Sequence, residues 1–436
     1  MRRKTVLFST MSLSRRRRAV AGPRIKSGVT DIEVPDDNPL RQRSPGGLKP
    51  FPLAARDWTV ASDRIPPMPV FPRFTPLAES LPPTVPFVGP ETQERARGAD
   101  FRARLGANEN GFGPAPSVIA AIAEAAPLSW RYGDPENHEL RQALAARLGV
   151  APESVVVGEG IDCLLGLIVR LIVEPGTPVV TSLGAYPTFN FHVAGFGGRL
   201  VTVPYRDDRE DLDALREAVV REQAPLVYLS NPDNPMGTWH SAADLVAFAR
   251  ALPETTLLVL DEAYCETAPG DAVPAIDALS GMANVVRFRT FSKAYGLAGL
   301  RVGYAFGVPE TVARFHRVRN HFGVNRLGQV AALAALDDAP WLDHVVRSVS
   351  AGRDRLSAIA RDNGLVPIGS ATNFVSMDCG GGAPRAKAIL EGLVGRGIFI
   401  RMPGPAPLNR CIRVSVGPEP DLALFAQILP EVLAAL

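Results

Sequence analysis

The sequence predicts an α/β protein with a large domain, built around a mostly parallel and doubly wound sheet, and a smaller α+β domain at the C-terminus. Short apolar segments alternate with helix-length segments between residues 154 and 290, which is typical of strands joined by helical crossovers. The apolar segments are nearly uninterrupted, as expected for strands covered by helices on both faces. After residue 309 this alternation stops, and two helical segments precede two separate strands.

The strands of the large domain end close to polar or glycine-containing segments. They are expected at residues 154–157, 178–181, 199–203, 226–229, 256–260 and 285–288. The segment 163–173 is apolar, but Arg170 interrupts it and it is shorter than the ~20 residues of a membrane span, so we expect a buried helix there. Another helix is expected at 242–252. In the small domain the pattern predicts helices at 310–320 and 328–336 and strands at 372–377 and 411–416.

Residues 1–100 differ from the rest of the chain. Residues 15–18 are all arginine, no acidic residue occurs before Asp31, and prolines cluster between residues 66 and 90. Proline removes backbone donors and blocks helix interiors, so we expect an extended or disordered arm. It is either a targeting segment or an upstream extension with a misassigned start, and the arginines lack the apolar stretch that a twin-arginine signal needs. The large domain is then expected at 101–309, with its first segment contributing to the small domain at 310–436.

Composition excludes several classes of function. The chain has 436 residues, of which 46% are hydrophobic and 21% charged, and its net charge is +2. This balance implies no strong attraction to nucleic acid or to an anionic membrane. The four cysteines are scattered without a CxxC pair, which favours neither a metal site nor a disulfide framework and fits a reducing, cytoplasmic location.

Candidate catalytic residues follow the ends of the expected strands, where ligands bind in open α/β sheets. Lys293 comes soon after strand 285–288, and a lysine desolvated in a cleft becomes a nucleophilic amine. Asp261 ends strand 256–260, where a buried carboxylate could pair with a pyridinium nitrogen. Tyr264 could reach the same ring. Read alone, Lys293 could be a surface lysine and Asp261 a helix N-cap.

Further candidates are weaker when read alone. Asn234 offers an amide in a proline-rich turn after strand 226–229. The glycine-rich turn at 158–162 joins a strand to a helix and could hold a phosphate on its backbone amides, with Arg301 as a fixed positive charge. Arg413 and Arg401 lie in apolar, strand-like segments. Either arginine could bind a carboxylate through two parallel hydrogen bonds, or could simply face solvent.

Together these motifs resemble the fold-type I pyridoxal-phosphate (PLP) aminotransferases. The residues that carry the resemblance are Asn231 to Gly237, Asp261 to Tyr264 and Ser292 to Tyr304. Residues 107–114 and 132–135 are most similar to the histidinol-phosphate aminotransferase branch. The resemblance extends over residues 102–436 and leaves out the arm.

The resemblance implies a role for each residue. Lys293 carries the cofactor covalently and moves the proton of the substrate, Asp261 pairs with the ring nitrogen, and Asn234 and Tyr264 bind the phenolic oxygen. Tyr186, or Phe189 if the register differs, stacks on the ring. The phosphate is surrounded by Gly160, Ile161, Asp162, Thr290, Ser292, Arg301 and, from the partner subunit of an obligate homodimer with shared active sites, Tyr132. Arg413 binds the substrate carboxylate, with Arg401 and Asn373 as further substrate contacts.

Three positions depart from the family pattern: Glu159, Ile161 and Met236, which stands where threonine is usual. The expected reaction moves an amino group from an amino acid, such as histidinol phosphate or an aromatic amino acid, to a 2-oxo acid such as 2-oxoglutarate. Two alternatives stay open at this stage, a PLP-dependent decarboxylase of the threonine-phosphate type and a non-catalytic binding protein with the same fold.

Overall fold

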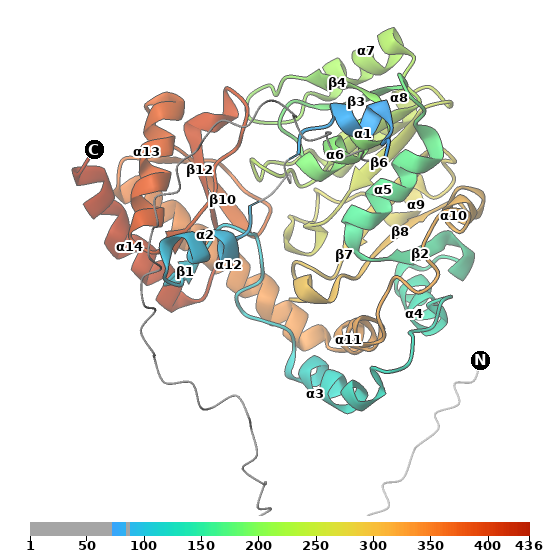
Figure 1. Ribbon diagram of the computed structural model, residues 1–436, viewed down its shortest axis with the longest axis horizontal. Coiled ribbons are helices and arrows are strands. Elements are labelled where there is room, and N and C mark those ends of the chain that lie inside the picture. Colours follow the sequence, from blue (N-terminus) through green and yellow to red (C-terminus); the bar gives the residue numbers. More distant parts are fainter. Residues whose placement is uncertain (1–71, 84–87) are drawn as a thin grey trace, which may run out of the picture. The chain divides into compact units, whose positions relative to one another are not determined.

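A seven-stranded sheet and a three-stranded sheet organise the chain (Figure 1). The computed structural model describes residues 72–83 and 88–436. Its strands are β1 (Ala103–Arg104), β2 (Val155–Gly158), β3 (Pro178–Ser182), β4 (Arg199–Val203), β5 (Leu226–Ser230), β6 (Leu257–Asp261), β7 (Val285–Thr290), β8 (Gly303–Gly307), β9 (Val366–Pro367), β10 (Phe374–Asp378), β11 (Ile398–Phe399) and β12 (Cys411–Ser415).

The helices lie between these strands and before them. They are α1 (Pro76–Ser80), α2 (Pro90–Arg97), α3 (Pro116–Ala125), α4 (His138–Leu148), α5 (Gly160–Ile172), α6 (Pro187–Gly195), α7 (Leu212–Glu222), α8 (Ala242–Ala251), α9 (Ile276–Leu279), α10 (Pro309–Phe315), α11 (Arg326–Asp337), α12 (Ala339–Asp362), α13 (Gly382–Gly395) and α14 (Glu419–Ala434). A 3-10 turn, η5 (Leu408–Arg410), precedes β12.

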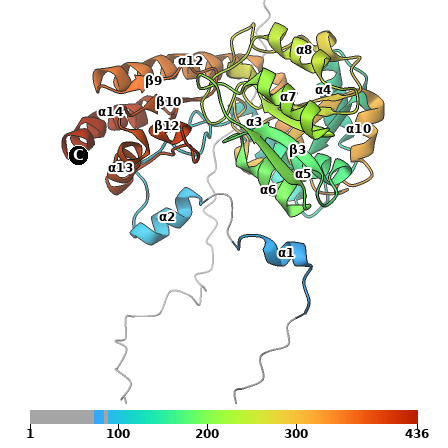
Figure 2. The ribbon, with the colours of Figure 1, turned by 90° about the horizontal axis from the view of Figure 1, so that it is seen from above.

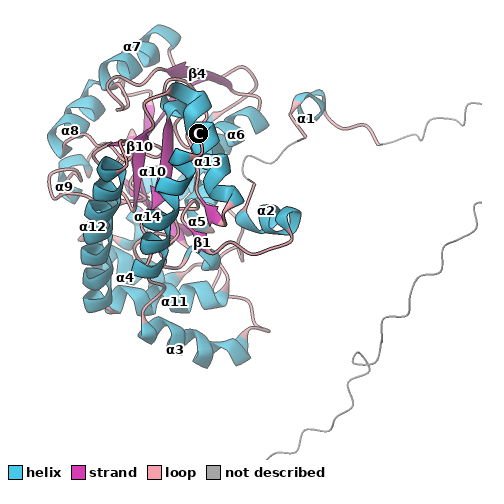
Figure 3. Ribbon diagram, turned by 90° about the vertical axis from the view of Figure 1, so that its left-hand side faces the viewer, coloured by secondary structure: helices cyan, strands magenta, loops and turns pink. Residues whose placement is uncertain are grey.

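The large sheet has the strand order β2-β8-β7-β6-β5-β3-β4, and all neighbours are parallel except those of β8. The prediction of a mostly parallel sheet is therefore confirmed, and all of its expected strands are present. Strand β8 was not predicted; it runs antiparallel between β2 and β7. Figure 3 shows helices lying outside the strands.

Both faces of the large sheet are buried, which explains why its strands are apolar throughout. In β5, Tyr228 packs in the cluster that contains α5 and α6, whereas Val227 and Leu229 pack against α7 and α8. Neighbouring residues of a strand point to opposite faces, so each face needs its own apolar residues. This packing fixes the ends of the strands and hence the positions of the residues that follow them.

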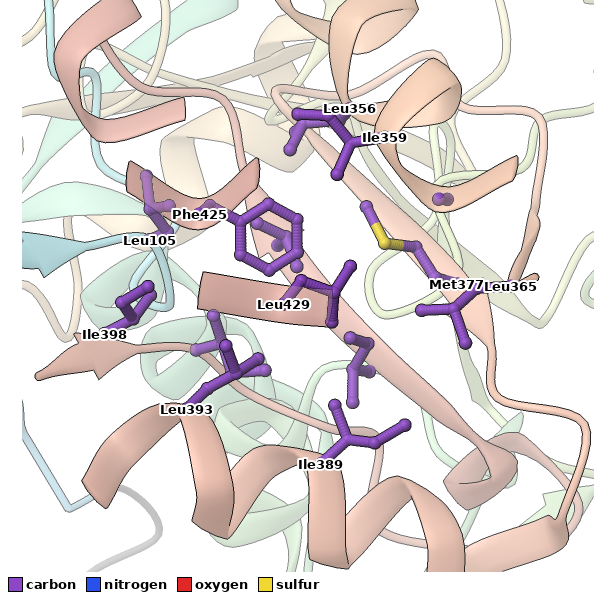
Figure 4. Close-up of a cluster of buried hydrophobic side chains, with 14 of the residues drawn as sticks. Leu105, Leu356, Ile359, Leu365, Met377, Ile389, Leu393, Ile398, Phe425 and Leu429 are labelled. Carbon is purple, nitrogen blue, oxygen red and sulfur yellow. The ribbon is translucent and has the colours of Figure 1, made fainter. Parts of the chain in front are cut away.

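The small sheet has the order β12-β10-β9 and is antiparallel. Its core collects side chains from α12, α13 and α14, such as Phe425 and Leu429 of α14, together with Met377 of β10 (Figure 4). Strand β1, from the beginning of the regular region, pairs with β11. Helix α10 contacts β2 and β8 of the large sheet, and α11 contacts α3 and α4. The long α12 follows them and contacts β9 and β10 of the small sheet (Figure 2). We therefore propose that the domain boundary lies at α12 instead of residue 310.

The prediction of an extended arm up to residue 100 is wrong for α1 and α2. Both helices begin with a proline in their first turn, where the missing N–H costs nothing because it would have no partner inside the helix. The N-cap Thr75 accepts a hydrogen bond from the amide of Ala78. The arginine run and the rest of the arm before residue 72 lie outside the described residues.

Candidate active site

A cavity of about 340 Å³ lies at the carboxyl ends of the large sheet's parallel strands. The residues predicted for the site that line it are Ile161, Asp162, Tyr186, Asn234, Asp261, Tyr264, Thr290, Ser292, Lys293 and Arg301. They come from the beginning of α5 and from the segments that follow β3, β5, β6 and β7. The topology of the sheet thus brings together residues that are far apart in the sequence.

Asp261 is the most deeply buried acid that lines the cavity, with 4% of its surface exposed. Its carboxylate accepts hydrogen bonds from the Tyr228 hydroxyl at 2.8 Å and from the Ala263 amide at 3.0 Å. Burial raises the pKa of Asp261 to about 6, although both hydrogen bonds oppose that shift. A carboxylate in this state gains stability when a cation approaches it from the cavity.

Lys293 reaches the same cavity from the turn after β7. Its Nζ donates to the carbonyl of Asn108 at 3.2 Å and lies 5.6 Å from the centre of the Tyr264 ring. Behind it, the Ser292 amide donates to the Thr290 hydroxyl at 3.0 Å, which fixes the turn. The amine is therefore held by one neutral oxygen and an aromatic face, and no carboxylate of the described residues accepts a hydrogen bond from it.

Tyr264 and Asn234 lie on the side of the cavity that faces the small domain. The Tyr264 hydroxyl accepts a hydrogen bond from Asn108 Nδ2 at 3.0 Å. Asn234 Oδ1 accepts a short hydrogen bond from Arg413. These contacts leave the Asn234 amide nitrogen and the Tyr264 hydroxyl proton for a ligand oxygen.

The turn before α5 and Arg301 form the opposite end of the cavity. Gly160 has a φ of +79°, a left-handed backbone conformation that favours glycine, and a Cβ there would lie 2.6 Å from Arg301 Nη2. Arg301 Nη2 lies 3.4 Å from Asp162 Oδ2, and the Tyr186 hydroxyl donates to Asp162 Oδ1 at 2.8 Å. A helix start beside an arginine is a typical anion site.

The three predicted substrate contacts, Arg401, Arg413 and Asn373, are not among the residues that line the cavity. Arg401 and Arg413 exchange backbone hydrogen bonds at 3.2 and 2.7 Å. Arg413 Nη2 also donates to the Gly106 carbonyl at 3.3 Å, and burial lowers the pKa of Arg413 to about 10. Arg401 Nη2 donates to the Val88 carbonyl at 2.6 Å. Asn373 Nδ2 donates to the Asn108 carbonyl at 3.0 Å.

Tyr132 does not line this cavity. It is 76% exposed, and its ring contacts that of Phe322 in a tilted arrangement, with 4.7 Å between the centroids and 36° between the planes. Of the two candidates for ring stacking, Tyr186 lines the cavity, whereas Phe189 is fully buried and stacks on Tyr228. The structure therefore favours Tyr186 over the alternative.

The three departures from the family pattern have different surroundings. Ile161 lines the cavity. The Glu159 carboxylate accepts hydrogen bonds from Cys163 Sγ at 3.0 Å and Asn320 Nδ2 at 3.3 Å, outside the cavity lining. Met236 is fully buried in a small apolar cluster with Leu408.

Sequence reasoning missed several residues that belong to the site. Tyr228, Ala107 and Glu109 line the cavity, and Asn108 contacts both Lys293 and Tyr264. The available signal for Tyr228 was its place two residues before the end of an apolar strand, where a tyrosine hydroxyl needs a partner. Residues 107–110 carried a family motif, but their contacts with the lysine arise only on folding.

The residues present fit PLP. The buried Asp261 suits a protonated ring nitrogen, Lys293 suits its aldehyde, and Arg301 with the start of α5 suits its phosphate. Among the described residues, Arg413 Nε and Asn373 Oδ1 are buried without a hydrogen-bond partner, which indicates that polar groups of a ligand complete this region. The described ranges contain no group of His, Cys, Asp and Glu side chains placed for a metal ion.

Comparison with known proteins agrees with this geometry. Residues 103–429 match the family model described as aminotransferase class I and II. The chain therefore belongs to this family and is an aminotransferase. Within it, the chain lies near the histidinol-phosphate aminotransferases. The decarboxylase and binding-protein alternatives are not favoured by these relatives.

Three relatives illustrate the similarity. The crystal structure of histidinol-phosphate aminotransferase from Sinorhizobium meliloti in complex with pyridoxal-5'-phosphate is 61% identical, with a TM-score of 0.82 over 84% of this chain and 99% of that one. The histidinol-phosphate aminotransferase of Moorella thermoacetica is 35% identical over 81% of this chain and 92% of the relative. That of an Anaeromyxobacter species is 39% identical over 79% and 95%.

Proposed function

We propose that this aminotransferase uses PLP to move the amino group of histidinol phosphate to a 2-oxo acid such as 2-oxoglutarate. The observation that carries the proposal is the joint presence, in one cavity, of Lys293, the buried Asp261 and the Arg301 anion site. The names of the relatives support the amino donor.

Each residue then has a specific task. Bound PLP supplies an electron sink that makes the α-proton of the amino donor acidic. Asp261 keeps the proton on the ring nitrogen, because an ionised carboxylate in a buried place favours a paired cation. Lys293 Nζ takes the α-proton and returns it as a general acid, with the Asn108 carbonyl orienting the amine. Arg301 and the backbone amides at the start of α5 hold the phosphate.

The arginines beside the cavity supply the substrate site. Arg413 in β12 forms an isolated β-bridge with Arg401, which follows β11, and the two side chains are proposed to present two cations to an anionic group. The partner of this pair is the phosphate of histidinol phosphate in one half-reaction and a carboxylate of the 2-oxo acid in the other. Asn373 holds the segment that carries Asn108 in place.

We further propose a cytoplasmic homodimer in which Tyr132 reaches the partner's cofactor phosphate. The support is the exposed group of Trp130, Tyr132 and Phe322, which are 76%, 76% and 52% exposed. Aromatic side chains gathered on a surface are typical of an interface. Among the described residues, no helix combines the length and apolar character needed to cross a membrane.

A panel of amino donors tests the substrate. Each donor is mixed with 2-oxoglutarate, and both the oxo product and carbon dioxide are measured. Histidinol phosphate should give the highest kcat/KM, aromatic amino acids lower values, and no carbon dioxide should be released. A higher value for another donor would replace the proposed substrate. Lys293→Ala should lose both the absorbance band of the bound cofactor and turnover; a variant that kept both would refute the role of Lys293.

A further inference from the structure

A three-member ion-pair cluster lies outside the cavity and joins its two sides. Arg410 Nη2 donates to both carboxylate oxygens of Asp208, at 2.8 and 2.7 Å. Arg410 Nε donates to Asp378 at 2.6 Å. The three side chains are only 26%, 23% and 26% exposed, and none of them lines the cavity. Charge-assisted hydrogen bonds between partly buried groups are stronger than those of a fully exposed ion pair.

The two acids belong to different domains. Asp378 ends β10 and pairs with Cys411, the neighbour of Arg410, within the small sheet. Asp208 lies in the tight turn between β4 and α7, where Arg206 and Arg209 exchange backbone hydrogen bonds at 2.9 and 3.0 Å. The φ of Asp208 in this turn is +62°. Arg410–Asp378 is therefore a contact within one domain, and Arg410–Asp208 crosses between the two.

Apolar packing lies next to the crossing contact. Met236 from the loop after β5 packs with Leu408 and Cys411 from the small domain, and these residues are 0%, 1% and 0% exposed. The hydroxyl of Ser376, in β10, donates to the Pro235 carbonyl at 2.8 Å. The ion pair thus borders a dry contact between the domains, where water competes less for the charges.

Arg410 and Asp208 are each connected to a residue of the site, Arg410 through the chain and Asp208 through hydrogen bonds. Arg410 immediately precedes β12, in which Arg413 is the third residue. At the other end, the Asp208 carbonyl accepts a hydrogen bond from the Thr238 hydroxyl at 2.8 Å. The Thr238 carbonyl in turn accepts from the amide of Asp233, the residue before Asn234, at 2.8 Å. Asn234 and Arg413 contact one another.

We propose that Arg410 is a positioning residue for substrate binding: its pair with Asp208 holds β12 against the Asn234 loop and so sets Arg413 for the substrate anion. Arg410 itself does not contact the substrate. The inference rests on the proposed function only in that Arg413 binds an anionic group of the substrate. It predicts that loss of the crossing contact weakens substrate binding while the groups that move the proton stay in place.

The test compares two variants that each remove one carboxylate from the same guanidinium. Asp208→Asn breaks the crossing contact, and Asp378→Asn, the matched control, breaks the contact within the small sheet. Pyridoxamine-phosphate-loaded enzyme is mixed with 2-oxoglutarate in single turnovers, which separate the dissociation constant from the limiting rate. Asp208→Asn should raise the dissociation constant about tenfold, since one charge-assisted hydrogen bond is worth about 1.4 kcal/mol or more. Its limiting rate, and both constants of Asp378→Asn, should stay within about twofold.

A double variant and an independent measurement complete the design. Arg410→Gln combined with Asp208→Asn should bind 2-oxoglutarate no more weakly than Arg410→Gln alone, because both changes remove the same contact. Equal effects of the two Asn variants, or a lower rate with unchanged binding, would overturn the positioning role.

Amide hydrogen exchange tests the positioning role of Arg410 without any substrate. In PLP-loaded enzyme, Asp208→Asn should speed amide exchange both in the turn at 206–209 and at the start of β12, whereas Asp378→Asn should affect only the latter. Unchanged exchange in Asp208→Asn refutes the proposal. If the wild type does not turn over 2-oxoglutarate, the proposed acceptor is wrong. The exchange measurement then tests the positioning role of Arg410 by itself.

Discussion

Replacing Tyr228 by phenylalanine would remove one hydrogen bond from Asp261 and leave the shape of the site almost unchanged. The Tyr228 hydroxyl donates to Asp261 Oδ2 at 2.8 Å, and the two residues are 0% and 4% exposed. The ring of Tyr228 stacks on Phe189 with 4.6 Å between centroids and 17° between planes, a contact that phenylalanine preserves. The variant therefore isolates the contribution of a single donor to the charge of Asp261.

The expected loss of PLP affinity follows from the burial and the charge of Asp261. A hydrogen bond to a charged group is worth about 1.5–3 kcal/mol, so the apoprotein should bind PLP about tenfold to a hundredfold more weakly. The pH dependence should move as well. Burial raises the pKa of Asp261 to about 6 and the Tyr228 hydroxyl lowers it, so the variant's pKa lies higher. PLP affinity should rise with pH as this carboxylate ionises, and the midpoint should shift to higher pH in Tyr228→Phe.

The assay is a titration of apoprotein with PLP, followed by absorbance, at pH values from about 5 to about 8, spanning the raised pKa. Tyr304→Phe serves as the control, because Tyr304 is also buried in the large sheet, at 6% exposure, but does not line the cavity. The control should match the wild type in affinity and midpoint. An unchanged dissociation constant and midpoint in Tyr228→Phe would show that this hydroxyl does not set the charge of Asp261.

Three further predictions concern stability, measured by urea unfolding of the PLP-loaded enzyme. Glu262→Gln should lower the unfolding free energy by about 3–5 kcal/mol, since it leaves the buried cations of Arg287 and Arg289 unpaired; a loss below 1 kcal/mol would contradict this. Met236→Thr should cost about 2–4 kcal/mol by emptying part of a fully buried apolar cluster, and a neutral result would mean the cluster repacks. Burial and the nearby Asp233 raise the pKa of Glu210 from 4.5 to about 8, so its contribution is complete below about pH 4.5 and is lost as pH rises. Glu210→Gln should therefore lose less stability than the wild type between about pH 5 and pH 8, and parallel curves would refute the shift.

The fold of the large domain was predictable because two-sided burial gives each parallel strand a continuous apolar run. Strand β8 was not predicted because its five residues, Gly303–Gly307, begin and end with glycine, and its first two residues belong to the lysine motif. Helices α1 and α2 were missed for a different reason, namely that prolines were taken as helix breakers although each helix begins at one. Helix α12 also begins with a proline in its first turn.

The cofactor residues were predictable for a topological reason. Asp261 ends β6 and Lys293 follows β7, and these strands are neighbours in the sheet, so the order of the strands alone brings the two residues to one edge. No comparable rule identifies Asn108, whose carbonyl meets Lys293 across 185 residues of sequence. Such a contact depends on how the segment before α3 crosses the cavity, and strand periodicity carries no information about that path.

The substrate residues were the hardest to predict from the sequence, because their positions depend on how the two domains pack against each other. Arg413 meets Asn234 over 179 residues of sequence, and the strand that carries Arg413 shares no sheet with the loop that carries Asn234. From the sequence, an arginine in such a strand could equally face solvent. The strand ends of the large domain hold Asp261 and Lys293 for the cofactor, whereas the contact between domains, through Asn234 and Arg413, sets the substrate anion site. Changes at that contact, such as those at Asp208 or Met236, should therefore alter substrate binding before they alter cofactor binding.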